Sequence, residues 1–230
     1  MTFSQATEPD QPAPDLAAAI AAACDRQGMA VPAQAIPPLA AYAERLWDWN
    51  ERLNLTRHTD VERFVARDVA DALALAPHLA QGERVLDVGT GGGMPGVLLA
   101  ILRPDLRVEL SESVGKRARA VTAILSEIGL ALPVYEGPAQ ELVARRPFGP
   151  RRFDTLVVRA VAPLAKLLGW FEPLAESFGR LLVIKGPRWE LELDEARSRR
   201  FVRAVSIHRI AAWPLTGADG ESVLLEIRAD

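Results

Sequence analysis

The sequence predicts an α/β fold, in which a mainly parallel seven-stranded sheet ends in an antiparallel hairpin and follows a layer of helices. Apolar residues in the first third of the chain recur at helical spacing, and no strand signal occurs there. From Glu83 onward, short β-rich apolar runs alternate with helical stretches, which is typical of a parallel sheet covered on both faces. Only a turn-rich stretch, residues 214–220, separates the last two strand candidates, so we expect them to pair at the sheet edge.

The N-terminal part divides into a tail and a helical layer. Residues 1–14 are rich in proline and glutamine and lack an apolar period, so we expect a disordered tail. Residues 15–80 are expected to form a helical subdomain and residues 81–230 the main domain. The three predicted helices of the layer span residues 15–28, 39–53 and about 60–75, with Asp15 as the N-terminal cap of the first.

The main domain alternates strands and helices. The predicted strands are residues 84–88, 107–111, 133–136, 155–159, 180–185, 202–210 and 222–228. The predicted helices are residues 96–102, 115–128, 138–145, 163–178 and 189–199. Five parallel strands followed by a hairpin are the layout of a Rossmann-like class I methyltransferase, whereas a dinucleotide dehydrogenase normally continues with another βαβ half.

Composition predicts a soluble cytoplasmic protein, which we expect to be a monomer although the sequence does not fix the oligomeric state. Hydrophobic residues make up 49% of the chain and charged residues 25%, as is ordinary for a globular protein. The longest apolar run, residues 97–102, is far shorter than a bilayer requires, so no membrane partner is expected. The single cysteine, Cys24, cannot form an intramolecular disulfide. No histidine has metal-ligand spacing with it or with another histidine, so no metal is expected.

The net charge of −3 hides an uneven distribution. Residues 145–209 contain fourteen Lys or Arg against seven Asp or Glu, a local net of +7, which leaves −10 for the rest of the chain. A basic segment of this size permits a polyanion-binding face on an acidic protein, although arginines that merely solvate helices would give the same count.

A glycine-rich loop directly after the first predicted strand is the strongest local signal. Asp87 is followed by Gly89-x-Gly91-x-Gly93, and glycines there let the backbone turn sharply and approach a ligand. The run from Gly91 to Gly96 also matches the dinucleotide fingerprint, so a nicotinamide or flavin enzyme is an alternative. An acid beside the loop suits a cationic, amine-bearing ligand better than a pyrophosphate, which it would repel.

The second predicted strand supplies an acid for a ribose. Glu112 lies at its carboxyl end, where a carboxylate can accept hydrogen bonds from both ribose hydroxyls of an adenosine. S-adenosylmethionine carries a ribose, an amine and a cationic sulfonium, and no phosphate. The two acids together therefore favour S-adenosylmethionine as the cofactor.

Two motifs that other nucleic-acid methyltransferases use are missing from this chain, which restricts the atom that could accept the methyl group. Methylation of a pyrimidine C5 generally needs a cysteine nucleophile, and Cys24 is far in sequence from the strand ends. Enzymes that methylate an exocyclic amine usually have a motif after the fourth strand, which consists of an acid or asparagine, two prolines and an aromatic residue. This chain has Val-Arg-Ala-Val-Ala-Pro at residues 158–163 instead, so methylation of an exocyclic amine is less favoured. A ring nitrogen such as guanine N7 has no proton to remove, so it needs alignment rather than a general base.

About residues 40–230 resemble a known family, the bacterial small-subunit ribosomal RNA guanine-N7 methyltransferases (RsmG, also called GidB). The motifs that carry the resemblance are Asn54-Leu-Thr56, Asp71, the loop from Asp87 to Gly96, Glu112-Ser-x-Gly-Lys-Arg117, Arg159-Ala160, Lys185-Gly186 and Gly220-Glu221. The resemblance implies S-adenosylmethionine-dependent methylation of N7 of a guanine in the 530 loop of 16S rRNA, on naked rRNA or on the small ribosomal subunit.

The resemblance also implies roles for single residues. The cofactor pocket would contain Asp87, Gly89, Gly91, Gly93, Met94, Glu112, Ala139, Gln140 and Arg159. Arg159 and Lys185, at the ends of the fourth and fifth strands, would act in catalysis, and Lys185 would also contact RNA. Lys116 and Arg117 are further expected RNA contacts.

The chain departs from the family pattern at four places. An arginine is usual near Pro138 and another at Ser222, an acid near Gln140, and a histidine near Asp68. We expect Arg145, Arg146, Arg151 and Arg152 to replace the two missing arginines as RNA contacts. Two other classes stay open: a class I methyltransferase that acts on a small molecule or protein, and a nucleotide-binding module without catalysis.

Overall fold

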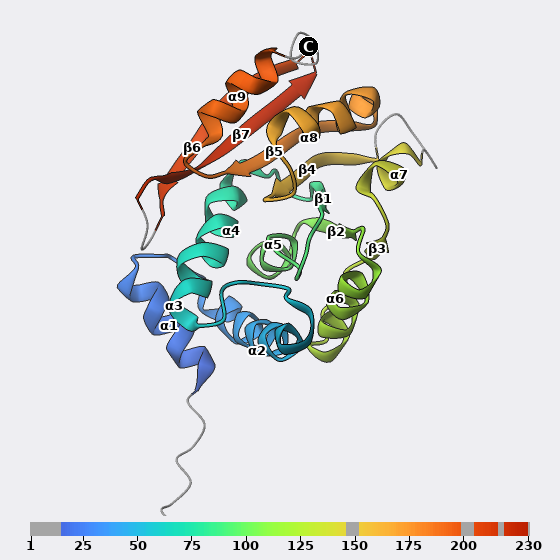
Figure 1. The fold of residues 1–230 in the computed structure, drawn as a ribbon. Helices are drawn as coiled ribbons and strands as arrows, with labels where there is room; N and C mark the ends of the chain where they lie inside the picture. The colour runs from blue at the N-terminus through green and yellow to red at the C-terminus, as the bar shows by residue number, and fades with distance from the viewer. Residues whose placement is uncertain (1–14, 146–151, 199–204, 216–218, 230) are drawn as a thin grey trace, which may run out of the picture.

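The computed structural model, which describes residues 15–145, 152–198, 205–215 and 219–229, is built around one seven-stranded sheet (Figure 1). The strand order is β3-β2-β1-β4-β5-β7-β6. The strands are β1 (Arg84–Val88), β2 (Arg107–Glu112), β3 (Val134–Glu136), β4 (Phe153–Arg159), β5 (Phe178–Lys185), β6 (Val205–Pro214) and β7 (Glu221–Ala229). β1 to β5 are parallel, and β7 is antiparallel to β5 and to β6. The predicted fold class is therefore confirmed.

The strand order places a topological switch point between β1 and β4. The chain leaves β1 toward β2 and β3 on one side, and β4 starts the other half of the sheet. In open α/β sheets, ligands bind beyond the carboxyl ends of the strands at such a point. The glycine loop follows β1, and Arg159 ends β4. The two strongest motifs of the sequence thus lie on either side of the switch point.

Helices cover both faces of the sheet. On one face lie α5 (Gly96–Leu102) and α6 (Gly115–Glu127), and their buried side chains share one core with Val85, Val157 and Leu182 of the sheet. On the other face lie α7 (Ala139–Ala144), α8 (Leu164–Phe171) and α9 (Trp189–Ser198), which form a second core. Every residue of β1 after Arg84 is buried, as expected of a central parallel strand.

The N-terminal helices join the first of these cores. α1 (Leu16–Arg26) and α2 (Ile36–Leu53) contribute Ile20, Leu39 and Leu46, which are completely buried in it. Asp15 caps α1 as predicted, and accepts hydrogen bonds from the backbone amides of Ala17 and Ala18. The division at residue 80 stays a prediction, and the predicted tail, residues 1–14, lies outside the described residues.

Two helices differ from the regular helices that the periodicity predicts. The segment predicted at 60–75 consists of α3 (Val61–Arg63), a π-helical stretch (Phe64–Val69) and α4 (Ala70–Leu75). The segment predicted at 163–178 is α8 followed by a 3-10 helix (Glu172–Ser177), with Pro173 in its first turn. Proline has no amide hydrogen to continue the α-helical ladder, which explains why α8 ends early.

The C-terminal hairpin forms one edge of the sheet. β6 extends to Pro214, beyond the predicted end at Ile210, and residues 202–204 of the prediction lie outside the described part. A register shift between Arg209 and Ala211 interrupts the pairing of β6 with β7. Irregularities of this kind protect an edge strand from pairing with another chain.

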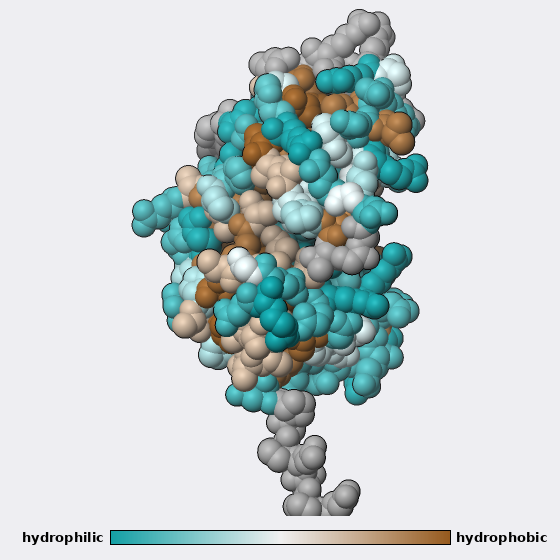
Figure 2. All heavy atoms as spheres, turned by 90° about the vertical axis from the view of Figure 1, so that its left-hand side faces the viewer, coloured by the Kyte–Doolittle hydropathy of each residue, from teal (hydrophilic) through white to brown (hydrophobic). Residues whose placement is uncertain are grey.

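The face that carries α1, α4, β6 and α9 is mostly hydrophilic, with apolar residues in separate patches (Figure 2). Among the described residues, no helix combines the length and apolar character that crossing a membrane requires.

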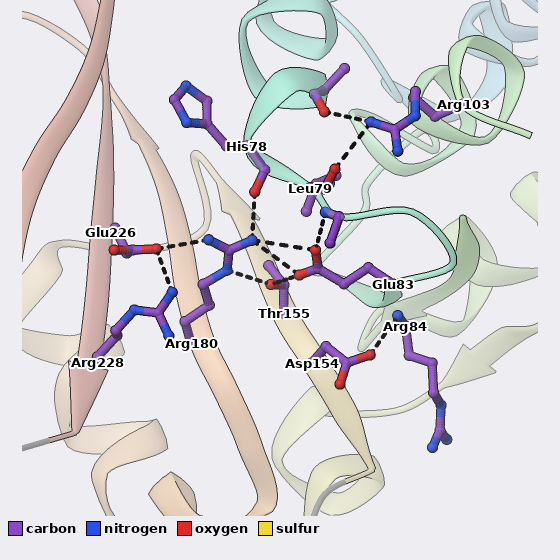
Figure 3. A network of polar contacts seen from close by, with 12 residues as sticks. His78, Leu79, Glu83, Arg84, Arg103, Asp154, Thr155, Arg180, Glu226 and Arg228 are labelled. Carbon is purple, nitrogen blue, oxygen red and sulfur yellow. Dashed lines mark hydrogen bonds and ion pairs between the residues drawn. The ribbon is translucent and has the colours of Figure 1, made fainter. Parts of the chain in front are cut away.

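A buried polar network ties the amino edge of the sheet to the N-terminal layer (Figure 3). The Arg180 guanidinium pairs with Glu226 at 2.8 Å and with Glu83 at 3.1 Å, and it donates hydrogen bonds to the Thr155 hydroxyl and the His78 carbonyl. The Thr155 hydroxyl in turn donates to Glu83. All these groups come from different segments, so the network fixes the order of the strands at this end.

Candidate active site

The glycine loop has the backbone conformation that the sequence predicts. Gly89, Gly91 and Gly93 have φ angles of 65°, 61° and 111°, in the left-handed region that favours glycine. A Cβ on Gly89 would meet Val161, in the loop after β4, at 2.8 Å. A Cβ on Gly96 would meet Leu110 at 2.3 Å, so this glycine lets α5 pack against β2. The glycines therefore let the loop turn sharply and pack directly against the segment that follows β4.

Asp87 is completely buried under this loop and keeps one oxygen without a partner. Its Oδ2 accepts hydrogen bonds from the Thr90 hydroxyl at 2.5 Å and the Gly96 amide at 2.9 Å. Its Oδ1 is buried and has no hydrogen-bond partner. Burial raises the pKa of Asp87 from 3.8 to about 6, against the opposing effect of both hydrogen bonds. A buried carboxylate oxygen without a partner is suited to a cationic ligand group, and the contact between Asp87 and such a group stays a prediction.

Glu112 connects the second strand to the glycine loop. The carboxylate is buried, with Oε2 accepting from the Gly91 amide at 2.9 Å and Oε1 from the Val114 amide at 2.8 Å. Its backbone carbonyl accepts from the Gly137 amide at 3.0 Å, which holds the segment after β3 alongside. That segment leads into α7, where Ala139 is buried and Gln140 half-buried. Each oxygen of Glu112 retains a lone pair for a ribose hydroxyl.

Arg159 lies between two buried aspartates of the N-terminal layer. Its Nη2 is 2.7 Å from Asp68 Oδ1, and its Nε is 2.7 Å from Asp71 Oδ2. The indole of Trp213, in β6, donates to the other oxygen of Asp71 at 3.0 Å. Burial raises the pKa of Asp71, and the Arg159 charge and the Trp213 hydrogen bond oppose that shift. The π-helical stretch ends at Val69, between these two aspartates, and π-turns occur frequently at functional sites.

Lys185 has internal partners. The side chain is buried, and Nζ donates to the Ala162 carbonyl and to Glu192 Oε2, each at 2.7 Å. The same Glu192 oxygen accepts from the Leu164 amide at the start of α8, at 2.9 Å. Lys185 and Glu192 thus hold the loop between β4 and α8. These contacts favour a positioning role for Lys185 over the direct RNA contact expected from the sequence.

The predicted RNA contacts lie in different places. Lys116 and Arg117 are in the first turn of α6, beside Glu112, and Arg117 Nε is buried without a partner. The Arg145 guanidinium lies 4.9 Å from the ring centroid of Tyr135. Arg146 and Arg151 lie outside the described residues. Arg152 precedes β4, at the opposite end of that strand from Arg159, and pairs with Glu109 at 3.1 Å. The structure therefore does not bring Arg152 to the candidate site.

Three residues near the site were missed as site residues by the sequence analysis. Asp68 enters there only as a departure from the family pattern, and His58 only as one of the histidines that lack metal-ligand spacing. Tyr42, a residue of the apolar stripe of α2, donates its hydroxyl hydrogen to the Gly92 carbonyl at 2.8 Å. Among the described residues no group of three or more His, Cys, Asp or Glu is arranged to hold a metal ion.

Comparisons with known proteins show the family of the chain. The family profile described as rRNA small subunit methyltransferase G matches residues 35–213. A ribosomal RNA small subunit methyltransferase G from Rhodopirellula baltica is 45% identical over 177 residues, which cover 77% of this chain and 74% of the relative. The protein of the same name from Serratia proteamaculans is 38% identical over 204 residues, or 88% of this chain and 94% of the relative.

A solved structure shares the fold. The O-methyltransferase from Bacillus cereus in complex with SAH superimposes with a TM-score of 0.55 at 18% identity, and the match covers 83% of this chain and 91% of that one. Sequence and fold thus agree, and the sequence relatives decide the family. The chain belongs to the rRNA small subunit methyltransferase G family.

Proposed function

We propose that this chain transfers a methyl group from S-adenosylmethionine to N7 of a guanine in the 530 loop of 16S rRNA, as a monomer in the cytoplasm. Membership of the rRNA small subunit methyltransferase G family supports the reaction and the class of substrate. The observation that carries the cofactor assignment is the unpartnered Oδ1 of Asp87, buried beneath a loop of left-handed glycines. That arrangement fits an amine-bearing nucleoside without a phosphate.

Different residues around the glycine loop would bind different parts of S-adenosylmethionine. Glu112, which is buried, would accept hydrogen bonds from the ribose hydroxyls, and the buried Asp87 carboxylate would face the cationic amino group. Ala139 and Gln140 would lie beside the adenine, and Met94 would line the pocket. When bound, S-adenosylmethionine supplies an electrophilic methyl group.

The reaction at guanine needs no base from the protein, because N7 carries a lone pair and no proton. The protein must align the base and place charge. Arg159 is suited to that task, because Asp68 and Asp71 hold its Nη2 and Nε at the carboxyl end of β4, across the switch point from the glycine loop. Lys116 and Arg117, on the rim of the cofactor site, are suited to contact RNA phosphates.

Labelled methyl transfer tests the proposal. The purified chain would be incubated with methyl-labelled S-adenosylmethionine and with 16S rRNA, or intact small subunits, from a strain that lacks this gene. We expect label at one guanine of the 530 loop, mapped by cleavage at 7-methylguanosine. Label in protein or in small molecules, or none in small-subunit rRNA, would contradict the proposal. Glu112→Ala is the control, because it should abolish cofactor binding in calorimetry.

A further inference from the structure

His58 is connected to Arg159 through a buried carboxylate. The His58 Nδ1 lies 3.0 Å from both oxygens of Asp68, and Asp68 Oδ1 lies 2.7 Å from Arg159 Nη2. The carboxylate between them is completely buried. Three residues that are 10 and 91 positions apart in the sequence thus form one continuous polar chain that ends at the strand end of β4.

The backbone around His58 is fixed on both sides. The Asn50 side chain accepts from the Thr56 amide at 2.8 Å, and the Thr56 hydroxyl accepts from the His58 amide at 3.0 Å. The indole of Trp47 donates to the His58 carbonyl at 2.8 Å. These bonds hold the loop after α2 in place. The His58 imidazole therefore lies beside Asp68 in one orientation.

The charges of the cluster explain why Asp68 needs a second donor. Asp68 and Asp71 are both buried, and one guanidinium serves them both. Asp71 has Trp213 as its additional donor. His58 Nδ1 occupies the corresponding place beside Asp68. Each aspartate then contacts one nitrogen of Arg159 and one ring nitrogen of a further residue, which fixes both carboxylates.

We propose that His58 is a positioning residue for methyl transfer: it donates Nδ1–H to Asp68, and thereby holds Asp68 in the orientation that places the Arg159 guanidinium beside the cofactor loop. The inference rests on the proposed function. Arg159 is close enough to Asp87 for their charges to interact. Val161, two residues after Arg159, packs where a Cβ of Gly89 would lie. A shift of Asp68 would therefore move Arg159, whereas Glu112 is held by the Gly91 and Val114 amides.

Substitutions that mimic either ring nitrogen test the proposal. In His58→Asn the amide nitrogen replaces Nδ1 and can still donate to Asp68, whereas in His58→Gln it replaces Nε2 and cannot. We expect His58→Ala and His58→Gln to lower kcat about tenfold, with the KM for S-adenosylmethionine within twofold of the wild type. His58→Asn should retain at least a third of the wild-type kcat. His208→Ala, at an exposed histidine of β6, is the matched control and should change nothing.

The outcomes separate the inference from the proposed function. An unaltered kcat in His58→Ala, or a His58→Asn variant as impaired as His58→Ala, would overturn the positioning role. Nitrogen-15 NMR of the imidazole provides a readout that does not depend on activity: the neutral ring should carry its proton on Nδ1 in the wild type and on Nε2 in Asp68→Asn. A wild-type ring protonated on Nε2 would overturn the inference even if rRNA is methylated. A wild-type protein that has the Nδ1–H ring and does not methylate rRNA would refute only the proposed function.

Discussion

Two buried arginines, each between two carboxylates, lie at opposite ends of neighbouring strands. Arg180, near the start of β5, pairs with Glu83 and Glu226, and Arg159, at the end of β4, pairs with Asp68 and Asp71. Their side chains are almost equally exposed, at 15% and 14%. In both clusters, therefore, one guanidinium pairs with two carboxylates, and the two arginines are exposed to about the same extent.

The difference lies in what surrounds the guanidinium. The Arg180 donors are directed to a hydroxyl, a carbonyl and two carboxylates of the chain itself (Figure 3). Arg159 uses Nε and Nη2 for its aspartates and lies beside the glycine loop and the buried Asp87. The Arg180 cluster joins segments at the amino edge of the sheet, and the Arg159 cluster lies at the carboxyl ends of the strands, beside the glycine loop. The pairing of an arginine with two carboxylates is common to both, so only the placement relative to the carboxyl ends of the strands distinguishes them.

The largest effect on stability is expected at the amino edge. Arg180→Met would leave Glu83 buried without its cation, and removing one partner of a buried ion pair costs about 3–5 kcal/mol. We expect the free energy of unfolding, measured by urea denaturation, to fall by about 3 kcal/mol, while methyl transfer at low temperature stays within about twofold. Arg228→Ala, at the exposed partner of Glu226, is the control and should cost less than about 1 kcal/mol. A large loss of methyl transfer in folded Arg180→Met would break the comparison.

The largest effect on catalysis is expected at the carboxyl edge. Arg159→Lys keeps the positive charge but replaces the planar fork with a single ammonium, which cannot hold Asp68 and Asp71 through two nitrogens in fixed geometry. We expect kcat to fall about 100-fold, or about 2.7 kcal/mol in transition-state stabilisation. Calorimetry should show S-adenosylmethionine binding within a few-fold of the wild type. Wild-type turnover in Arg159→Lys would show that its role is structural, like that of Arg180.

The raised pKa of Asp87 allows the proposed cofactor site to be tested through the pH dependence of stability. Its pKa in the folded protein is about 6, above 3.8, so the folded state without cofactor binds more protons than the unfolded state between these pH values. The contribution of Asp87 to stability therefore falls as pH rises through this range, and the cost of the ionised carboxylate is complete at pH 7. Asp87→Asn should stabilise the cofactor-free protein by about 2 kcal/mol at pH 7 and weaken S-adenosylmethionine binding. The stability gain should vanish near pH 4, and a destabilised Asp87→Asn at pH 7 would contradict this account.

The smallest effect is expected at Lys185. Its ammonium is buried against Ala162 and Glu192, so Lys185→Met should lower kcat by less than about tenfold and leave the salt dependence of RNA binding unchanged. Lys116→Ala, at an exposed lysine, is the matched variant, and it should reduce the slope of log K against log salt by about 1. A reduced slope in Lys185→Met would instead identify Lys185 as an RNA contact.

The sequence predicted most of the sheet and the cofactor loop because their signals are local. The apolar run of β1, the glycines after it and Glu112 at the end of β2 each follow from neighbouring residues and strand topology. The break in α8 was also encoded locally, in Pro173, but the apolar period on both sides concealed it.

The partners of the site arginine could not be predicted in this way. Arg159 pairs with aspartates 91 and 88 positions earlier, and no local pattern records such a distance. The π-helical stretch before Ala70 was hidden as well, because its wider turn differs from a regular helix by a single residue per turn. His58 was considered only as a metal ligand and set aside, because its spacing from Cys24 and from the other histidines does not fit a metal site. The fold thus followed from periodicity, whereas the electrostatics of the site required the three-dimensional arrangement.

The hydrogen bond from Tyr42 to the Gly92 carbonyl has a consequence for how the protein opens. It joins a completely buried residue of α2 to the loop that is proposed to bind the cofactor, so the loop cannot separate from α2 without breaking a buried bond. Amide hydrogen exchange in residues 89–96 should therefore follow the local unfolding of α2 rather than that of α9 on the far face. Cofactor binding would then slow exchange in α2 as well as in the loop. The exchange rates of the N-terminal helices would thereby depend on whether the cofactor is bound.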